Sequence, residues 1–134
     1  MRAGRSGIRP RPGGDEGQAT VELALVLPFV VVLLLSVVQI GLVVRAQLRV
    51  EHAAHEGARA AAVADDPVAV GRRVALAAVD DPDRTEVMVT SEQVGGEDAV
   101  RVSVSWRLTG TLPLVGSAVD GRTVQASAAL RVEP

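Results

Sequence analysis

Residues 23–44 read LALVLPFVVVLLLSVVQIGLVV, a run without a single charged side chain. At about 1.5 Å per residue, a helix of this length covers the roughly 30 Å of a bilayer's hydrocarbon core. A cleavable secretory signal has a shorter apolar core of about 7–15 residues followed by a small-x-small site, whereas this run leads into Arg45 and Arg49. The sequence therefore predicts a transmembrane segment at 23–44.

The residues inside and around this run predict its shape and orientation. A kink is expected near Pro28, because neighbours in a membrane helix can re-satisfy the carbonyl that a proline leaves without a donor. Four arginines precede the run, whereas only two follow it closely. The positive-inside rule therefore predicts a single-pass membrane protein with a cytoplasmic N-terminus and an extracytoplasmic C-terminal domain.

Composition excludes several classes of function. The formal net charge of −2 provides no basic field for nucleic acid, and one Trp, one Phe and no Tyr provide almost no surface on which bases stack. The absence of Cys rules out disulfides and thiolate metal sites. The serines outside the span have no histidine in the same domain to activate them, and no glycine-rich phosphate loop precedes a helix. We expect neither enzymatic activity nor a cofactor.

Two clusters of polar residues suggest metal sites but lack the ligand spacing. His52 and His55 are the only histidines, and they do not form an HExxH motif. Asp80, Asp81 and Asp83 lack the spaced ligands and the terminal Glu of an EF-hand loop. We interpret the histidines as solvated side chains and the aspartates as a helix end followed by a turn, so no metal site is predicted.

The sequence beyond the span favours two helices. Strong helix formers continue to Val63, which predicts one helix over 18–63 and a stalk beyond the membrane. Asp66 followed by Pro67 is typical of a helix start and predicts a second helix over 68–79.

Three strands are predicted after the second helix. Residues 86–90 form a short apolar segment, and residues 100–108 and 124–132 alternate between apolar and polar side chains. Gly95 and Gly96 favour a hairpin between the first two segments. The predicted fold class is α+β, with a long N-terminal transmembrane and stalk helix, a second short helix and a three-stranded antiparallel sheet. Residues 64–134 form the predicted head domain, with Trp106 in its core.

The residues before the span indicate a removable leader. Residues 1–17 are rich in Gly, Pro and Arg and are expected to be disordered. Glu22 places a carboxylate at the threshold of the apolar run, where an unpaired charge is costly. Near a helix N-terminus this carboxylate favours the macrodipole, and pairing with a cation of a neighbouring copy would offset the cost of the charge. Alternatively, Glu22 lies among the lipid headgroups simply as an acid at a helix start.

These residues resemble a known family. Gly17 followed by Gln18-Ala19-Thr20-Val21-Glu22 is similar to the type IV prepilin processing pattern, in which cleavage after the glycine leaves a glutamate as the fifth mature residue. The stretches GQATVELALVLPF, from Gly17, and AAHEGARAAAV, from Ala53, resemble the TadE-like family of minor pilins or pseudopilins in tight-adherence (Tad) pilus systems.

The resemblance implies a function and a set of partners. A prepilin peptidase would cut between Gly17 and Gln18 on the cytoplasmic side, and Glu22 would dock the mature subunit. The partners would be membrane lipid, the peptidase, other pilin subunits and Tad assembly-platform proteins, and the mature chain would enter a surface pilus. The alternative is a signal-anchored extracellular membrane protein whose head domain binds a protein partner.

Overall fold

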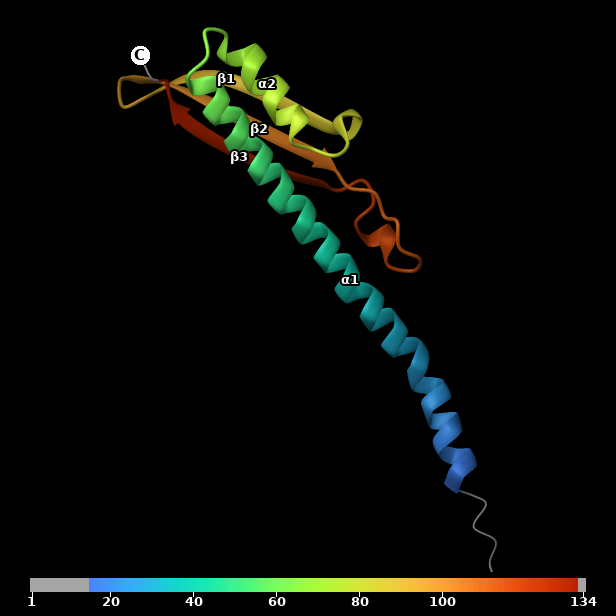
Figure 1. The fold of residues 1–134 in the computed structure, drawn as a ribbon. Coiled ribbons are helices and arrows are strands. Elements are labelled where there is room, and N and C mark those ends of the chain that lie inside the picture. Colours follow the sequence, from blue (N-terminus) through green and yellow to red (C-terminus); the bar gives the residue numbers. More distant parts are fainter. Residues whose placement is uncertain (1–14, 133–134) are drawn as a thin grey trace, which may run out of the picture. The chain divides into compact units, whose positions relative to one another are not determined.

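The computed structural model describes residues 15–132, and the side chains from residue 17 onward. The chain divides into two compact units, Met1–Leu34 and Leu35–Pro134, which are described separately. The helix α1, Asp15–Ala62, contributes to both (Figure 1). The second unit also contains a second helix and a three-stranded sheet, so the predicted α+β fold is confirmed.

The start of α1 differs from the prediction. Disorder was expected over 1–17, of which 1–14 lie outside the described residues, but residues 15–17 are helical. Extending an existing helix adds one hydrogen bond for each residue that is ordered, so a helix formed by the downstream sequence propagates upstream until a breaker is reached. Gly13 and Gly14 stand directly before the first helical residue.

The helix α2, Pro67–Ala77, begins as the sequence predicts. The Asp66 side chain accepts a hydrogen bond from the Ala69 backbone N–H at 3.1 Å, and Pro67 occupies the first turn, where its missing N–H has no cost. The helix ends before the predicted Val79. A short 3₁₀ turn, η1 at Pro82–Arg84, then leads into the sheet.

The sheet consists of β1 (Thr85–Val94), β2 (Glu97–Arg107) and β3 (Thr123–Arg131), antiparallel and in that order. Gly95 and Gly96 form the predicted hairpin turn with φ of 65° and 86°. Positive φ at both central residues is the turn that matches the twist of paired strands, and glycine adopts it without a steric cost. β1 extends beyond the predicted 86–90 because its pairing with β2 continues to Val94 opposite Glu97.

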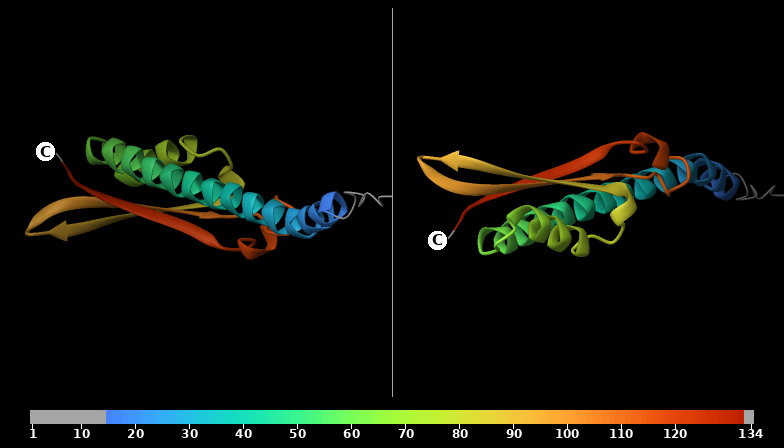
Figure 2. Two further views of the ribbon diagram at one scale, coloured as in Figure 1. Left: turned by 90° about the horizontal axis from the view of Figure 1, so that it is seen from below. Right: turned by 90° about the horizontal axis from the view of Figure 1, so that it is seen from above.

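Both helices pack on one face of the sheet, and no helix or strand within residues 15–132 covers the opposite face (Figure 2). Alternate residues of β2 point into the layer between them, and Val100, Val102 and Val104 are almost completely buried. The second unit's part of α1 faces these valines with small side chains, which let the helix approach the sheet closely. The α1 residues in this core are Val50, Ala53, Ala54, Ala58 and Ala61.

Polar contacts between described residues also join α1 to the rest of the second unit. Gln47 Nε2 donates a hydrogen bond to the Gln125 carbonyl of β3 at 3.2 Å, and Arg49 forms an ion pair with Asp80 after α2. Together with the alanine-rich core, these contacts make residues 35–62 of α1 part of the head's structural unit.

A pair of glycines sets the closest approach of the two helices. A Cβ atom on Gly57 of α1 would lie 3.0 Å from the Gly71 carbonyl oxygen and 2.9 Å from Ala75 Cβ, both on α2. A Cβ atom on Gly71 would lie 3.0 Å from Ala61 Cβ. The helices therefore touch through their backbones at this crossing.

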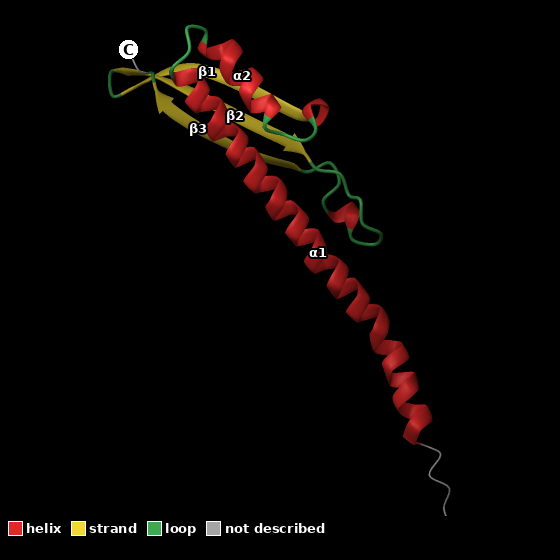
Figure 3. Cartoon of the chain, in the orientation of Figure 1, coloured by secondary structure: helices red, strands yellow, loops and turns green. Residues whose placement is uncertain are grey.

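The β2–β3 connection, residues 108–122, is the longest loop among the described residues (Figure 3). It carries one short 3₁₀ turn, η2 at Gly116–Ala118. It lies at the end of the sheet opposite the Gly95–Gly96 hairpin, because both connections leave the same strand, β2.

Candidate functional site

The predicted scissile bond between Gly17 and Gln18 lies in the first turn of α1. Gly17 is exposed, and a Cβ atom on it would meet nothing within 4 Å. The first N–H groups of a helix have no intrahelical acceptor, so this turn opens at lower cost than the helix interior. A protease that binds an extended substrate can reach this bond without unfolding the apolar segment. Cleavage at this bond stays a prediction.

Glu22 lies one helical turn after Gln18. The two residues are four apart, about 6 Å along the axis, and share one face of α1. The Glu22 side chain is exposed, and no cation within residues 17–132 forms an ion pair with it. Its carboxylate is therefore accessible to a cation of another molecule. The docking role of Glu22 stays a prediction.

Pro28 lies inside α1, and the helix continues on both sides of it. Because proline has no N–H, the Ala24 carbonyl four residues earlier lacks its usual helical donor. The kink expected at Pro28 stays a prediction.

The first unit presents apolar side chains on every side of α1. All residues from Val21 to Leu34 are exposed, and the exposed fractions of the large side chains run from 41% at Val30 to 77% at Phe29. A helix that is hydrophobic all round belongs in lipid or in a protein core. Within the described chain, Gly17–Ala62 of α1 is long and apolar enough to cross a membrane, and only 6% of its most apolar window is buried.

The character of α1 changes at Gln39, which the sequence analysis did not single out. This side chain is 6% exposed although it lies within the predicted span 23–44. It begins the inward-facing stripe that continues through Val43 and Ala46 to Val50. The signal available in the sequence was that Gln39 lies four residues before Val43 and seven before Ala46, which is the spacing of one helix face.

Gln39 lines a cavity of about 290 Å³ between α1 and the end of the sheet. Trp106 lines the same cavity and also packs against the core, as its predicted core position implies. Gln39 Oε1 and Trp106 Nε1 are both buried without a hydrogen-bond partner among the described residues. The other lining residues are Leu42, Val43, Arg45, Ala46, Arg49, Asp80, Leu108, Thr109, Thr111 and Val119.

The histidines lie on the surface. His52 and His55 are exposed, and His55 Nδ1 lies 2.8 Å from the Glu51 carbonyl oxygen. Within residues 17–132, no group of three or more His, Cys, Asp or Glu is placed to hold a metal ion.

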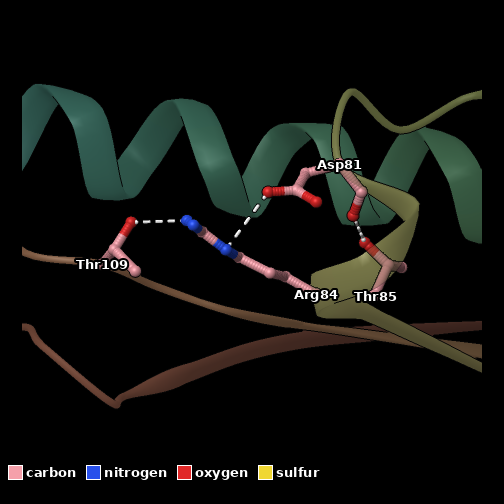
Figure 4. Close-up of polar contacts among 4 residues, drawn as sticks. All are labelled: Asp81, Arg84, Thr85 and Thr109. Atoms are coloured by element: carbon pink, nitrogen blue, oxygen red, sulfur yellow. Dashed lines mark hydrogen bonds and ion pairs between the residues drawn. The ribbon is translucent and has the colours of Figure 1, made fainter.

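The acidic turn after α2 forms contacts with its own neighbours. Asp81 Oδ2 lies 3.3 Å from Arg84 Nε, and Arg84 Nη1 donates a hydrogen bond to Thr109 Oγ1 at 3.0 Å (Figure 4). The Thr85 hydroxyl donates to the Asp81 carbonyl oxygen at 2.7 Å. Arg84 thus connects the start of β1 to the 108–122 loop.

A helix long and apolar enough to cross a membrane, followed by a small two-layer α+β unit, is consistent with a protein anchored in a membrane by one helix. Residues 17–59 match the model of the TadE-like protein family, so the TadE-like resemblance is confirmed over this segment. The family groups components associated with Tad pili. The match covers most of α1 and ends before α2. No curated protein and no solved structure matched the chain.

Proposed function

We propose that this chain is a minor pilin or pseudopilin of a Tad-type pilus, matured by a prepilin peptidase that cuts between Gly17 and Gln18. The observation that carries the proposal is the apolar stretch of α1, exposed along its length from Val21 to Leu34, with the single carboxylate of Glu22 at its start and Gly17 five residues earlier. The TadE-like match over 17–59 supports the same assignment.

The apolar stretch has two successive environments in this proposal. In the membrane, lipid covers the exposed side chains between Val21 and Leu34. In a pilus or its assembly platform, the helices of neighbouring subunits replace the lipid. The chain's role is mechanical, because α1 is stored in the bilayer until subunits pack together.

Glu22 selects the partner helix. Cleavage creates an α-amine on Gln18, which is largely protonated at neutral pH. Placing an ionised side chain in hydrocarbon costs on the order of 3 kcal/mol on insertion scales, so an unpaired Glu22 favours any arrangement that supplies a cation. The α-amine of an adjacent subunit, shifted by about one helical turn, supplies it.

Orientation follows from the arginines. Arg2, Arg5, Arg9 and Arg11 hold the leader in the cytoplasm, where the peptidase acts, and the head lies outside the cytoplasmic membrane. The partners in this proposal are membrane lipid, the peptidase, other pilin subunits and Tad assembly-platform proteins.

The maturation test is the mass of the membrane-extracted chain, expressed with and without a Tad prepilin peptidase that processes its own major pilin. We expect the peptidase to produce a chain that begins at Gln18. Gly17→Leu should block this change, whereas the control Gly14→Leu should mature normally. A chain that retains residues 1–17 beside an active peptidase would contradict the proposal and favour a signal-anchored protein whose head binds a protein partner.

The docking test separates processing from assembly. Glu22→Gln removes the charge at nearly constant volume, whereas Glu22→Asp keeps it. We expect Glu22→Gln to reduce the recovery of the chain with sheared pili or with the assembly complex, and Glu22→Asp to retain more of it. If Glu22→Ala leaves both maturation and incorporation unchanged, Glu22 is only an interfacial acid and the segment is a plain tether.

A further inference from the structure

The 108–122 loop lies beside α1 at the end of the predicted span. Residues Leu108 and Val119 of the loop line the same cavity as Gln39, Leu42 and Ala46 of α1. The loop extends past the end of the sheet along this part of the helix (Figure 1 and Figure 2). If the bilayer covers α1 as far as Val44, this loop reaches the level of the outer membrane–water interface.

The apolar composition of the loop suits a position at the membrane–water interface. From Leu108 to Val119 the sequence LTGTLPLVGSAV contains no charged residue. Loops in water are usually built from polar turn residues, and an apolar cluster left exposed on a soluble surface indicates a partner. Leu114 is 77% exposed, as much as Phe29 in the apolar stretch of α1.

The loop is held in this conformation by its own contacts. Gly110 and Gly116 touch through their backbones, since a Cβ atom on Gly110 would collide with the Gly116 carbonyl group. The Gly116 N–H donates to the Leu112 carbonyl at 2.9 Å, and the Gly110 N–H donates to Asp120 Oδ1 at 3.3 Å. These contacts hold the tip with Pro113 and Leu114 exposed and with Leu112 and Val115 half-buried.

Leu114 carries backbone strain at the tip. Its φ of 68° lies in the left-handed region, and it is the one non-glycine residue with positive φ within residues 15–132. A side chain with a Cβ atom pays a steric cost there, and such outliers concentrate at functional positions. Leu114 is thus both exposed and strained within a well-connected loop.

We propose that the 108–122 loop is a second membrane contact, whose tip at 112–115 enters the interfacial region of the bilayer that α1 spans. This proposal rests on the proposed function only in requiring that α1 spans a membrane. The partner is a phospholipid surface, because Gln39, Leu42 and Val43, which line the cavity together with the loop, lie within the predicted span 23–44. A protein partner at this level would first have to displace the lipid around α1.

The flanking residues fit the headgroup layer. Trp106, the only tryptophan, lies two residues before the loop, and tryptophan is enriched at membrane–water interfaces. Arg107 and Arg122 stand at the two ends of the loop and are exposed, so they can meet lipid phosphates. Charged residues thus flank the loop, and none lies within the apolar tip at 112–115.

The proposal predicts a depth for Leu114. Because the chain has no cysteine, single-cysteine variants can carry one nitroxide label each. The full chain, in nanodiscs of phosphatidylglycerol and phosphatidylethanolamine, is probed for collision with oxygen, which concentrates in lipid, and with a water-soluble nickel chelate. Leu33→Cys places the label in the predicted span. Val94→Cys places the label at an exposed position at the opposite end of the sheet, which is separated from the loop by the length of β2, about 35 Å.

We expect Leu114→Cys and Leu33→Cys to be accessible to oxygen and protected from nickel, and Val94→Cys to show the reverse. Nickel accessibility at 114 with a lipid signal at 33 overturns the loop proposal and leaves the membrane anchor intact. Nickel accessibility at both positions overturns the anchor as well. Protection of 114 from both reagents indicates a protein contact, such as a second copy, and also overturns the loop proposal.

A second measurement needs no label near the tip. Brominated lipids quench tryptophan at short range, and Trp106 is the only tryptophan of the chain. We expect quenching in the wild-type chain and a loss of quenching in Leu114→Asp, whose exposed position tolerates the change without unfolding the head. The control Val94→Asp should leave quenching unchanged. Equal quenching in Leu114→Asp and the wild type would overturn the proposal.

Discussion

Substituting Gly57 tests whether α1 and α2 touch as closely as the structure indicates. In Gly57→Ala the new methyl group would lie 2.9 Å from Ala75 Cβ, 3.0 Å from the Gly71 carbonyl oxygen and 3.2 Å from Val102 Cγ1. Real Cβ atoms essentially never lie as close as 2.9 Å to another heavy atom. Two of the three neighbours belong to the helix framework and cannot rotate away, so the helices must separate.

Two opposing effects determine the size of the change. Overpacking of a core costs about 1–3 kcal/mol, whereas replacing glycine by alanine inside a helix stabilises by about 1 kcal/mol. The contacts at Gly57 favour the upper half of the overpacking range, so we expect a net loss of about 1 kcal/mol. Gly71→Ala gains the same helix propensity but has one contact at 3.0 Å and the next at 3.3 Å, so its net effect should be close to zero.

The assay is thermal unfolding of the full chain in detergent, followed by the fluorescence of Trp106 in the head. For a unit of about 100 residues, a loss of 1 kcal/mol lowers Tm by roughly 4–8 °C. The matched control is Gly41→Ala, also within α1, where a Cβ atom would meet nothing within 4 Å. Gly57→Leu should lower Tm further than Gly57→Ala, because the larger side chain forces a wider separation.

The ranking of the variants can refute the reasoning. If Gly57→Ala raised Tm, as an alanine substitution at an open helical position would, the inferred close crossing of α1 and α2 would be wrong. If Gly71→Ala were the more damaging of the two, the assignment of the tighter contact to Gly57 would be wrong.

Three further substitutions test the head by chemical unfolding. Val102→Ala should cost about 2 kcal/mol, because Val102 is completely buried and the neighbouring backbone cannot fill the space. Gly96→Ala should cost about 1–2 kcal/mol through its positive φ, whereas Gly95→Asn should be nearly neutral since asparagine suits that turn position. Asp66→Ala should cost about 1 kcal/mol by removing the cap of α2, and Asp66→Asn should restore most of it. Equal effects of Gly96→Ala and Gly95→Asn, or of Asp66→Ala and Asp66→Asn, would contradict the corresponding contact, and an unchanged stability in Val102→Ala would contradict the burial of Val102.

The candidate processing site was accessible to sequence reasoning because its parts are local. Gly17, Gln18 and Glu22 occupy one short segment beside an apolar run, and helical spacing alone places the last two on one face. The same holds for the cap at Asp66 and the turn at Gly95 and Gly96, each of which depends on the conformation of a few consecutive residues.

The extent of β1 and the start of α1 were not determined locally. Residues between Ser91 and Val94 lack a clear alternation, and they become strand because β2 supplies backbone partners as far as Glu97. Residues 15–17 become helical because the downstream helix propagates into them. In both cases cooperativity with a neighbour outweighs the local preference.

By itself, the sequence determined the membrane-length helix, the glycine and carboxylate that precede it, and the α+β order of the head, since each depends on spacing along one element. Only the tertiary structure decided that Gln39 is buried beside Trp106, that Gly57 meets Gly71, and that the 108–122 loop lies along α1. Those contacts join residues far apart in the chain. They arise from close packing, which no one-dimensional pattern records.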